Sequence, residues 1–277
     1  QLSLEIAVII VIVAAIAEYI DSTLGMGYGT ILTPILILLG FEPFEIIPSI
    51  LLSELITGFT AGFTHHYIGN VDFRPKTMNL KKIFFALKEY GIFESFNKGI
   101  PFHLKIVILV VFCSIFGTLS AVFLAINLSD FYLKLCIGIL ITAIGLLILS
   151  TLQKDFKFSW KKITLLGLIA SFNKGISGGG FGPVVTVGQL LSGIRTRSAV
   201  AITSLAEGLV CLVGVSTYLL ASNSVNWKLA PYLIMGGLLT VPLSAVTVRR
   251  IKTIKLRISI GIITFLLGVL SILKIIL

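Results

Sequence analysis

The sequence predicts an all-α, polytopic membrane protein, and three observations lead to this fold class. Of the 277 residues, 56% are hydrophobic and 12% are charged, whereas soluble domains have about 45–50% apolar and about 25% charged residues. The apolar residues form long solid runs, which excludes a disordered chain and does not fit the short alternating segments of an outer-membrane barrel. The two halves of the chain also resemble each other, which predicts a pair of repeats.

Ten apolar runs predict the helical segments. They cover residues 4–20, 28–40, 45–66, 104–126, 131–150, 162–174, 181–193, 197–221, 229–248 and 256–276. A helix needs about 20 residues to cross the bilayer core, and the runs that begin at Tyr28, Lys162 and Phe181 are clearly shorter. Short segments interrupted by glycine are typical of broken or re-entrant helices. The hairpins 4–40 and 162–193 therefore either span the membrane or dip into it and return.

The net charge of +10 gives the expected orientation in the membrane. When the loops between the runs alternate in side, 18 of the 22 Lys and Arg residues fall on one side. The other four are Lys134, Lys174, Lys228 and Lys274. Basic residues collect in cytoplasmic loops, so the basic side is cytoplasmic, both termini are external, and the protein is a multi-pass protein of the inner cell membrane. The surplus charge thus indicates topology and not a nucleic-acid partner.

One cytoplasmic loop, residues 68–103, is unusually long, and its segment 79–98 has an amphipathic pattern. Apolar side chains form one helical stripe there, namely Leu80, Ile83, Phe84 and Leu87. This pattern favours a helix lying on the inner leaflet of the bilayer as an anchor. A regulatory or partner-binding role is the alternative.

The sequence gives no sign of a metal, a cofactor or an enzyme. The three cysteines, Cys113, Cys136 and Cys211, lie inside apolar runs without CxxC spacing, which favours neither a disulfide framework nor a zinc site. We interpret them as lipid-facing or core residues. No HExxH, nucleophile elbow or P-loop occurs either.

The similarity between the halves places polar residues in register at an offset of 153 positions. The segment 25–30, GMGYGT, aligns with 178–183, GGGFGP, and Glu54 then falls on Glu207 without a gap. Each half holds five segments, an odd number, so the second half must be inverted relative to the first. Inverted repeats place a substrate site near the midplane at their interface. The expected domains are residues 1–150 and 151–277.

Two glycine clusters are the first candidate substrate-binding elements. They comprise Gly25, Gly27 and Gly29 in the first half, and Gly178, Gly179, Gly180 and Gly182 in the second. Glycine costs about 1 kcal/mol in a helix interior, so clustering it in a membrane segment needs a reason. A break in the helix would free backbone N–H groups to bind an anion, helped by the positive end of the next helix. Close helix packing through small residues is the alternative.

Two glutamates are the main candidates for proton coupling or gating. Glu54 and Glu207 lie about ten residues from either end of their segments, so both should be near the bilayer centre. A carboxylate there is costly and typically marks an ion or proton path, although a protonated glutamate joining two helices is the alternative. Glu18 and Asp21, which close the first segment, are further candidates for this role.

The remaining candidates surround these groups. Lys174, near the second glycine cluster, could attract an anion and pair with Asp21, or could instead reach a membrane surface. The hydroxyls of Ser53, Thr203 and Ser204 could bind a small oxyanion, although single hydroxyls more often bind backbone. His65 and His66 are candidates for proton handling, with a structural role favoured, and this pair is too small for a metal site.

The chain carries three motifs. The first is a glycine-rich stretch that runs into a short proline-containing helix, as in Gly178-Gly179-Gly180-Phe181, with Pro34 in the short helix of the first half; the others are Thr203-Ser204-Leu205 and Gly69-Asn70-Val71-Asp72-Phe73. Together they resemble the sulfite exporter TauE/SafE family of membrane permeases. The first half departs from the pattern, with Gly25-Met26-Gly27 and with Pro48-Ser49 near the place of Thr-Ser. The resemblance implies export of a small sulfur-containing anion such as sulfite or an organosulfonate.

The sequence therefore predicts a secondary transporter that exports such an anion by alternating access, with coupling to protons. We also expect a homodimer, only because many transporters are dimers. Three alternatives stay open: an ion channel with paired carboxylates, a transporter of another small organic anion, and, much less favoured, a membrane enzyme.

Overall fold

The computed structural model describes residues 3–75, 99–151, 159–192, 194–222, 225–250 and 253–276. In these ranges every regular element is an α-helix, which confirms the all-α prediction. The helices are α1 (Leu4–Leu24), α2 (Tyr28–Leu38), α3 (Pro43–Ile68), α5 (Phe102–Asn127), α6 (Asp130–Ser150), α7 (Trp160–Ser177), α8 (Phe181–Leu191), α9 (Thr196–Ser222), α10 (Ala230–Thr247) and α11 (Thr253–Ile276). The predicted amphipathic segment 79–98 lies outside the described residues.

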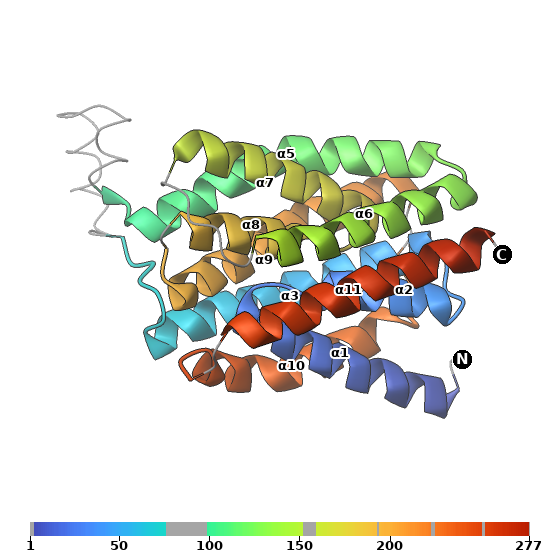
Figure 1. Cartoon of the computed structure of the whole chain (residues 1–277), viewed down its shortest axis with the longest axis horizontal. Helices are drawn as coiled ribbons and strands as arrows, with labels where there is room; N and C mark the ends of the chain where they lie inside the picture. Colours follow the sequence, from blue (N-terminus) through green and yellow to red (C-terminus); the bar gives the residue numbers. More distant parts are fainter. Residues whose placement is uncertain are drawn as a thin grey trace.

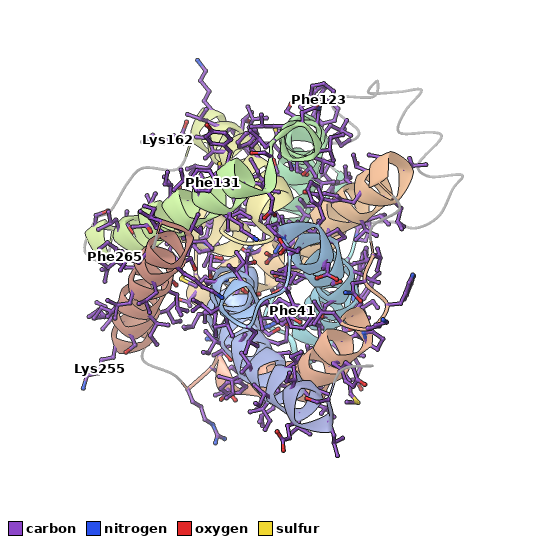
Figure 2. All side chains as sticks on the ribbon, turned by 90° about the vertical axis from the view of Figure 1, so that its right-hand side faces the viewer. Phe41, Phe123, Phe131, Lys162, Lys255 and Phe265 are labelled. Atoms are coloured by element: carbon purple, nitrogen blue, oxygen red, sulfur yellow. The ribbon has the colours of Figure 1, made fainter. Side chains whose placement is uncertain are left out.

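Among the described residues, six helices are long and apolar enough to cross a membrane: α3, α5, α6, α9, α10 and α11. Their outward faces carry large exposed apolar side chains; Phe123, for example, is 69% exposed. Figure 2 looks along the bundle, and Phe123 and Phe265 lie at its rim, where lipid would surround them. The protein is thus a polytopic membrane protein, as the composition predicts.

The first short helix turns back toward the end of the bundle at which α1 begins (Figure 1). Lys274, near the end of α11, donates hydrogen bonds from Nζ to the carbonyl oxygens of Ile37 and Leu38, 3.0 Å each. These carbonyls end α2, so α2 finishes beside the C-terminal end of α11. Helices α1 and α2 therefore form a re-entrant hairpin that enters from the end carrying both chain termini.

Helices α7 and α8 form a second hairpin from the opposite end. Trp160 begins α7, and its ring lies 5.7 Å from the ring of Phe102, which begins α5. Only four residues separate α8 from α9, and Ser198 near the start of α9 donates to the carbonyl of Asn70, which follows α3. We call this end, where α3 and α10 finish, the basic end, because the predicted basic loops lie here.

The two hairpins meet where their helices break. Gly25 and Gly178 end α1 and α7 in the left-handed conformation, with φ of 71° and 70°, which glycine adopts at little cost. A Cβ on Gly29 would overlap the carbonyl oxygen of Gly178, and a Cβ on Gly182 would lie 2.5 Å from that of Gly25. The glycines therefore provide both a helix break and close packing, the two alternatives raised by the sequence.

The packing partners follow the order of the five helices in each half. Helix α1 packs on α10 as α7 packs on α5, while α3 packs on α9 and α6 on α11. The bounds of α2, shifted by 153 residues, coincide with those of α8. These pairings are those expected of two related halves. Their inversion, and the domain division at residue 150, stay predictions.

Candidate functional site

A buried lysine between two glutamates lies at the centre of the molecule. Lys174, in the last turn of α7, contacts Glu54 of α3 and Glu207 of α9. The distance from its Nζ to Oε1 of Glu207 is 2.7 Å. The exposed fraction is 0% for Lys174, 2% for Glu54 and 4% for Glu207. The structure thus brings together three candidates that are far apart in the sequence.

The carboxylate of Glu54 is only partly satisfied. Its Oε2 accepts from Lys174, and the Sγ of Cys211 lies 3.8 Å from the same oxygen. Its Oε1 has no hydrogen-bond partner in the structure. Cys211 is therefore a neighbour of the ion cluster, which our interpretation as core filler missed. Its position four residues after Glu207, on the same helix face, was the available signal.

Two more carboxyl groups, on α1, complete the cluster. Asp21 is 6% exposed and Glu18 is 2% exposed. Asp21 is close enough to Glu207, Glu18 and Glu54 to be repelled electrostatically by each of them. Ser22 donates its hydroxyl hydrogen to Glu18. Lys174 contacts Glu54 and Glu207, so ionisation of all four carboxyl groups would leave a large unbalanced negative charge in the protein interior.

Asp21 also occupies the start of the first short helix. The backbone N–H of Tyr28, the first residue of α2, donates to Oδ1 of Asp21 at 3.3 Å. A carboxylate therefore binds where the sequence predicts an anion, at a helix N-terminus after a glycine break. At an offset of 153 the residue equivalent to Asp21 is Lys174. The two breaks thus carry opposite charges, and Asp21 and Lys174, considered as a pair from the sequence, have other partners.

The candidate hydroxyls have different partners. Ser53 shares a 2.7 Å hydrogen bond with the phenol of Tyr28, which also donates to the carbonyl of Leu233 on α10. Ser204 donates to the carbonyl of Val200 in its own helix, the common arrangement for a membrane serine. Tyr28, an aromatic residue next to a glycine break, was missed by the sequence analysis.

Thr203 belongs to a separate buried polar group on α8 and α9. Its Oγ1 lies 2.7 Å from Oγ1 of Thr186 and 3.1 Å from Nε2 of Gln189. Thr186 in turn donates to the carbonyl of Gly25. The sequence analysis did not single out Thr186 or Gln189, because lone polar residues in an apolar helix give little local signal.

The other glycines of the two clusters form the turns between the helices of each hairpin. The backbone N–H of Gly179 donates to the hydroxyl of Ser177 at 3.2 Å. Gly27 and Gly180 precede α2 and α8 as their N-caps, with φ of 136° and 78°.

His65 is held by two hydrogen bonds at the basic end. Its Nε2 lies 3.0 Å from the carbonyl of Ser22, and its Nδ1 lies 2.9 Å from Nδ2 of Asn70. Because the amide nitrogen is a donor, Nδ1 accepts and Nε2 carries the hydrogen that bonds Ser22. Asn70 also binds the carbonyl of Ala245 and the Nε of Arg249. His66 contacts the backbone of Val71 and Phe73 through Nδ1.

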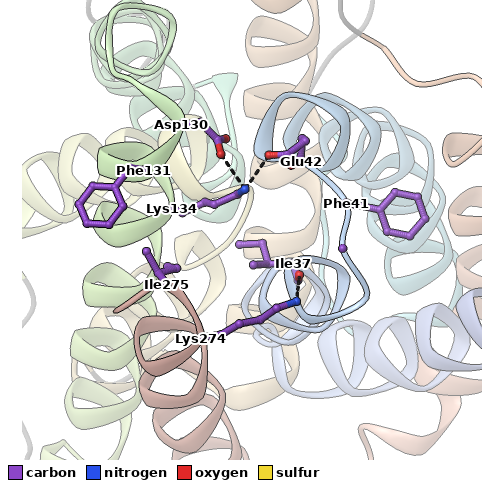
Figure 3. A pocket seen from close by; sticks show the side chains of 9 residues that line it. Ile37, Phe41, Glu42, Asp130, Phe131, Lys134, Lys274 and Ile275 are labelled. Carbon is purple, nitrogen blue, oxygen red and sulfur yellow. Dashed lines mark hydrogen bonds and ion pairs between the residues drawn. The ribbon is translucent and has the colours of Figure 1, made fainter. Parts of the chain in front are cut away.

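The described residues contain no group of three or more His, Cys, Asp or Glu side chains that could hold a metal ion. A cavity of about 300 Å³ opens at the end that carries the termini. Figure 3 shows Lys134 in this cavity between Glu42 and Asp130, with Nζ to oxygen distances of 2.7 and 2.6 Å. Lys274 points to the carbonyl of Ile37 across the same cavity.

Comparison with known proteins agrees with this architecture. The family model of the sulfite exporter TauE/SafE matches residues 10–78 and 90–271. The probable membrane transporter protein YtnM of Bacillus subtilis (strain 168) is 25% identical over 256 residues, which cover 88% of this chain and 75% of the relative. No solved structure has significant similarity to the chain. Because the family model covers most of its length, the chain belongs to the sulfite exporter TauE/SafE family and is a membrane transporter rather than an enzyme.

Proposed function

We propose that the protein exports a small sulfur-containing oxyanion, sulfite or an organosulfonate, by alternating access coupled to protons. The observation that carries this proposal is the buried contact of Lys174 with Glu54 and Glu207. The matched family supplies the substrate class. The inner cell membrane, external termini and a homodimer belong to the same proposal.

The charge of the cluster links anion binding to proton binding. When both glutamates are ionised, Lys174 is more than neutralised, and an anion at the same place would be repelled. When the glutamates take up protons, the ammonium group has no opposite charge and an oxyanion can replace the carboxylates. Each ligand therefore favours the binding of the other, which is a reciprocal coupling of binding free energies. Asp21, whose carboxylate already binds the α2 N-terminus, is the internal group that an anion would displace.

The membrane potential gives the expected direction. A dianion that moves with one proton carries one net negative charge, and an interior-negative potential drives that charge outward. The potential contributes about 2.3 kcal/mol per charge per 100 mV. Proton coupling therefore reduces the electrical driving force for a dianion without reversing it.

Reconstituted vesicles can test both parts of the proposal. Vesicles that contain labelled sulfite should release it through the wild-type protein, faster when the compartment that holds sulfite is acidified. Glu207→Gln, which removes one ionisable group, should weaken this pH dependence. Sulfite itself gains a proton near neutral pH, so the comparison is between wild type and variant with the same substrate. A variant that transports normally with an unchanged pH response would rule out the coupling role.

The substrate class is tested by ligand-dependent thermal stability in detergent. Sulfite, thiosulfate, a sulfonate, sulfate and a carboxylate are compared at the same ionic strength. A ligand that binds the folded protein raises its melting temperature. Stabilisation by sulfite or a sulfonate supports the proposal, whereas stabilisation by the carboxylate alone would assign the protein to another organic anion.

A further inference from the structure

A chain of buried polar side chains leads from the hairpin crossing toward the basic end. It begins at the carbonyl of Gly25 in the crossing, to which Thr186 donates at 2.7 Å. It continues through Thr203 and ends at Gln189, close to the end of α8. All three side chains have an exposed fraction of 0%. Gln189 lies eight residues after the start of α8, about 12 Å along that helix, and three residues after Thr186.

The hydrogen bonds of this chain leave one end of the amide without a partner. The hydroxyl of Thr186 has two acceptors within reach, the carbonyl of Gly25 and Oγ1 of Thr203. Thr203 also accepts from Nε2 of Gln189. The Oε1 of Gln189 is buried and has no hydrogen-bond partner in the structure. Buried polar atoms are nearly always paired, so we take this oxygen as a point at which a ligand group can bind.

The other half of the protein shows that the fold does not require these polar groups. At the offset of 153, Gln189 corresponds to Leu36 and Thr203 to Ile50. Both apolar residues are buried, with exposed fractions of 1% and 0%. Only Thr186 has a polar counterpart, Thr33, whose hydroxyl donates to the carbonyl of Ser177 at 2.8 Å. Thus Thr33 and Thr186 both tie a short helix to the facing break, whereas Thr203 and Gln189 have no such shared role.

We propose that Gln189, Thr203 and Thr186 form a subsite for the oxyanion on its route between the basic end and Lys174. Half a turn of the Gln189 amide about its last bond would keep a hydrogen bond to Thr203, which would then donate to Oε1. That turn presents both amide hydrogens to a ligand at the position now without a partner. Neutral donors of this kind hold an oxyanion without the strong attraction of a fixed positive charge. This inference rests on the proposed function, because it assumes that the cargo is an oxyanion.

The main test is Gln189→Met, which keeps the shape of the side chain and removes its polar atoms. An unsatisfied buried amide costs stability, so the unliganded variant should melt at the wild-type temperature or above it. Its sulfite flux into or out of the basic side should fall about tenfold, the loss expected for one hydrogen bond to a charged ligand. The matched control is Leu36→Met, the same residue at the equivalent position, which should leave the flux within about twofold of wild type.

Three results would overturn the inference. The first is a Gln189→Met flux within about twofold of wild type. The second is a clear fall in the melting temperature of the unliganded variant, because the amide would then serve the fold. The third is an equal loss of flux in Leu36→Met. Thr203→Val provides a second test, with the same expected loss of flux. If the wild-type protein moves no oxyanion at all, the proposed function itself fails, and this outcome is distinct from the three above.

Discussion

Lys174 is a buried cation that is stabilised by its contacts with two glutamates. A lone ammonium or carboxylate buried at this depth is costly, and pairing reduces this cost only while each partner keeps its contact. In the structure Lys174 holds two carboxylates, and neither has another basic partner among the described residues. Removal of the lysine therefore differs from removal of one glutamate.

We expect Lys174→Met to destabilise the protein by about 3–5 kcal/mol, the usual cost of breaking a buried ion pair. Thermal unfolding in detergent measures the loss. The triple variant with Glu54→Gln and Glu207→Gln should regain most of the lost stability. A single variant as stable as wild type would contradict the role of these ion pairs.

At the basic end, Asn70 connects three segments by its side chain. Asn70→Ala would remove the contacts to His65, Ala245 and Arg249, at a cost of about 1–3 kcal/mol for each buried group left unsatisfied. Thermal unfolding measures the loss, and Asn127→Ala, which removes an exposed side chain bonded to its own helix, is the control. Equal melting temperatures for the two variants would contradict this role of Asn70.

The sequence predicted the members of the central cluster better than their contacts. Intramembrane position identified Glu54 and Glu207, because a charge at this depth is rare, and nearness to a glycine break identified Lys174. The sequence suggested Asp21 as the partner of Lys174, whereas the two glutamates hold it. Which carboxyl groups reach one ammonium depends on how three helices pack, and no spacing along the chain encodes this. Gln189 was missed for a related reason, since its lack of a partner is visible only in the packed structure.

At the scale of elements, the break positions followed directly from the glycines. The predicted short runs began at Tyr28 and Phe181, and α2 and α8 begin at these residues. Whether the hairpins span the membrane or return to the side of entry could not be predicted from the sequence, because α1 and α7, with 21 and 18 residues, are also long enough to cross. Contacts at the ends of α2 and α8 decide the question, and these are made by segments distant in sequence.

The close contact between the two hairpins predicts the effect of adding one methyl group at Gly29. Gly29→Ala should destabilise the protein by at least about 1–3 kcal/mol, the usual cost of overpacking, because its Cβ would overlap backbone that cannot rotate away. Gly99→Ala is the control, since a Cβ there meets no atom within 4 Å. Yield of folded protein and melting temperature are the measurements. Tolerance of Gly29→Ala equal to that of Gly99→Ala would contradict the close crossing.

At the scale of the whole molecule, the arrangement of charge predicts orientation. Both chain ends lie at one end of the bundle (Figure 1), and Arg74, Arg195, Arg249 and Arg250 lie in connections at the other. The rule for basic loops then predicts that the termini lie outside the cell. Among the described residues, six helices are long enough to cross, and an even number of crossings agrees with both termini on one side.

Cysteine labelling in intact cells tests this orientation. The background variant lacks Cys113, Cys136 and Cys211, and single cysteines replace Ser129 or Arg250, which are both exposed. A membrane-impermeant maleimide should label the variant at position 129 in intact cells. It should label the variant at position 250 only after the cells are made permeable. The reverse pattern would invert the topology and place the polar chain of Gln189 on the external side.

The contact between the two breaks also restricts how the molecule can move. Gly29 and Gly179 leave no space at the crossing, where a Cβ on Gly179 would lie 2.6 Å from the backbone of Gly29. Sliding one hairpin along the other by a residue would bring a larger side chain into this space. We therefore expect the hairpins to rotate about their contact rather than to slide along each other. Such a rotation would move their outer ends, which lie at opposite ends of the bundle, at the same time.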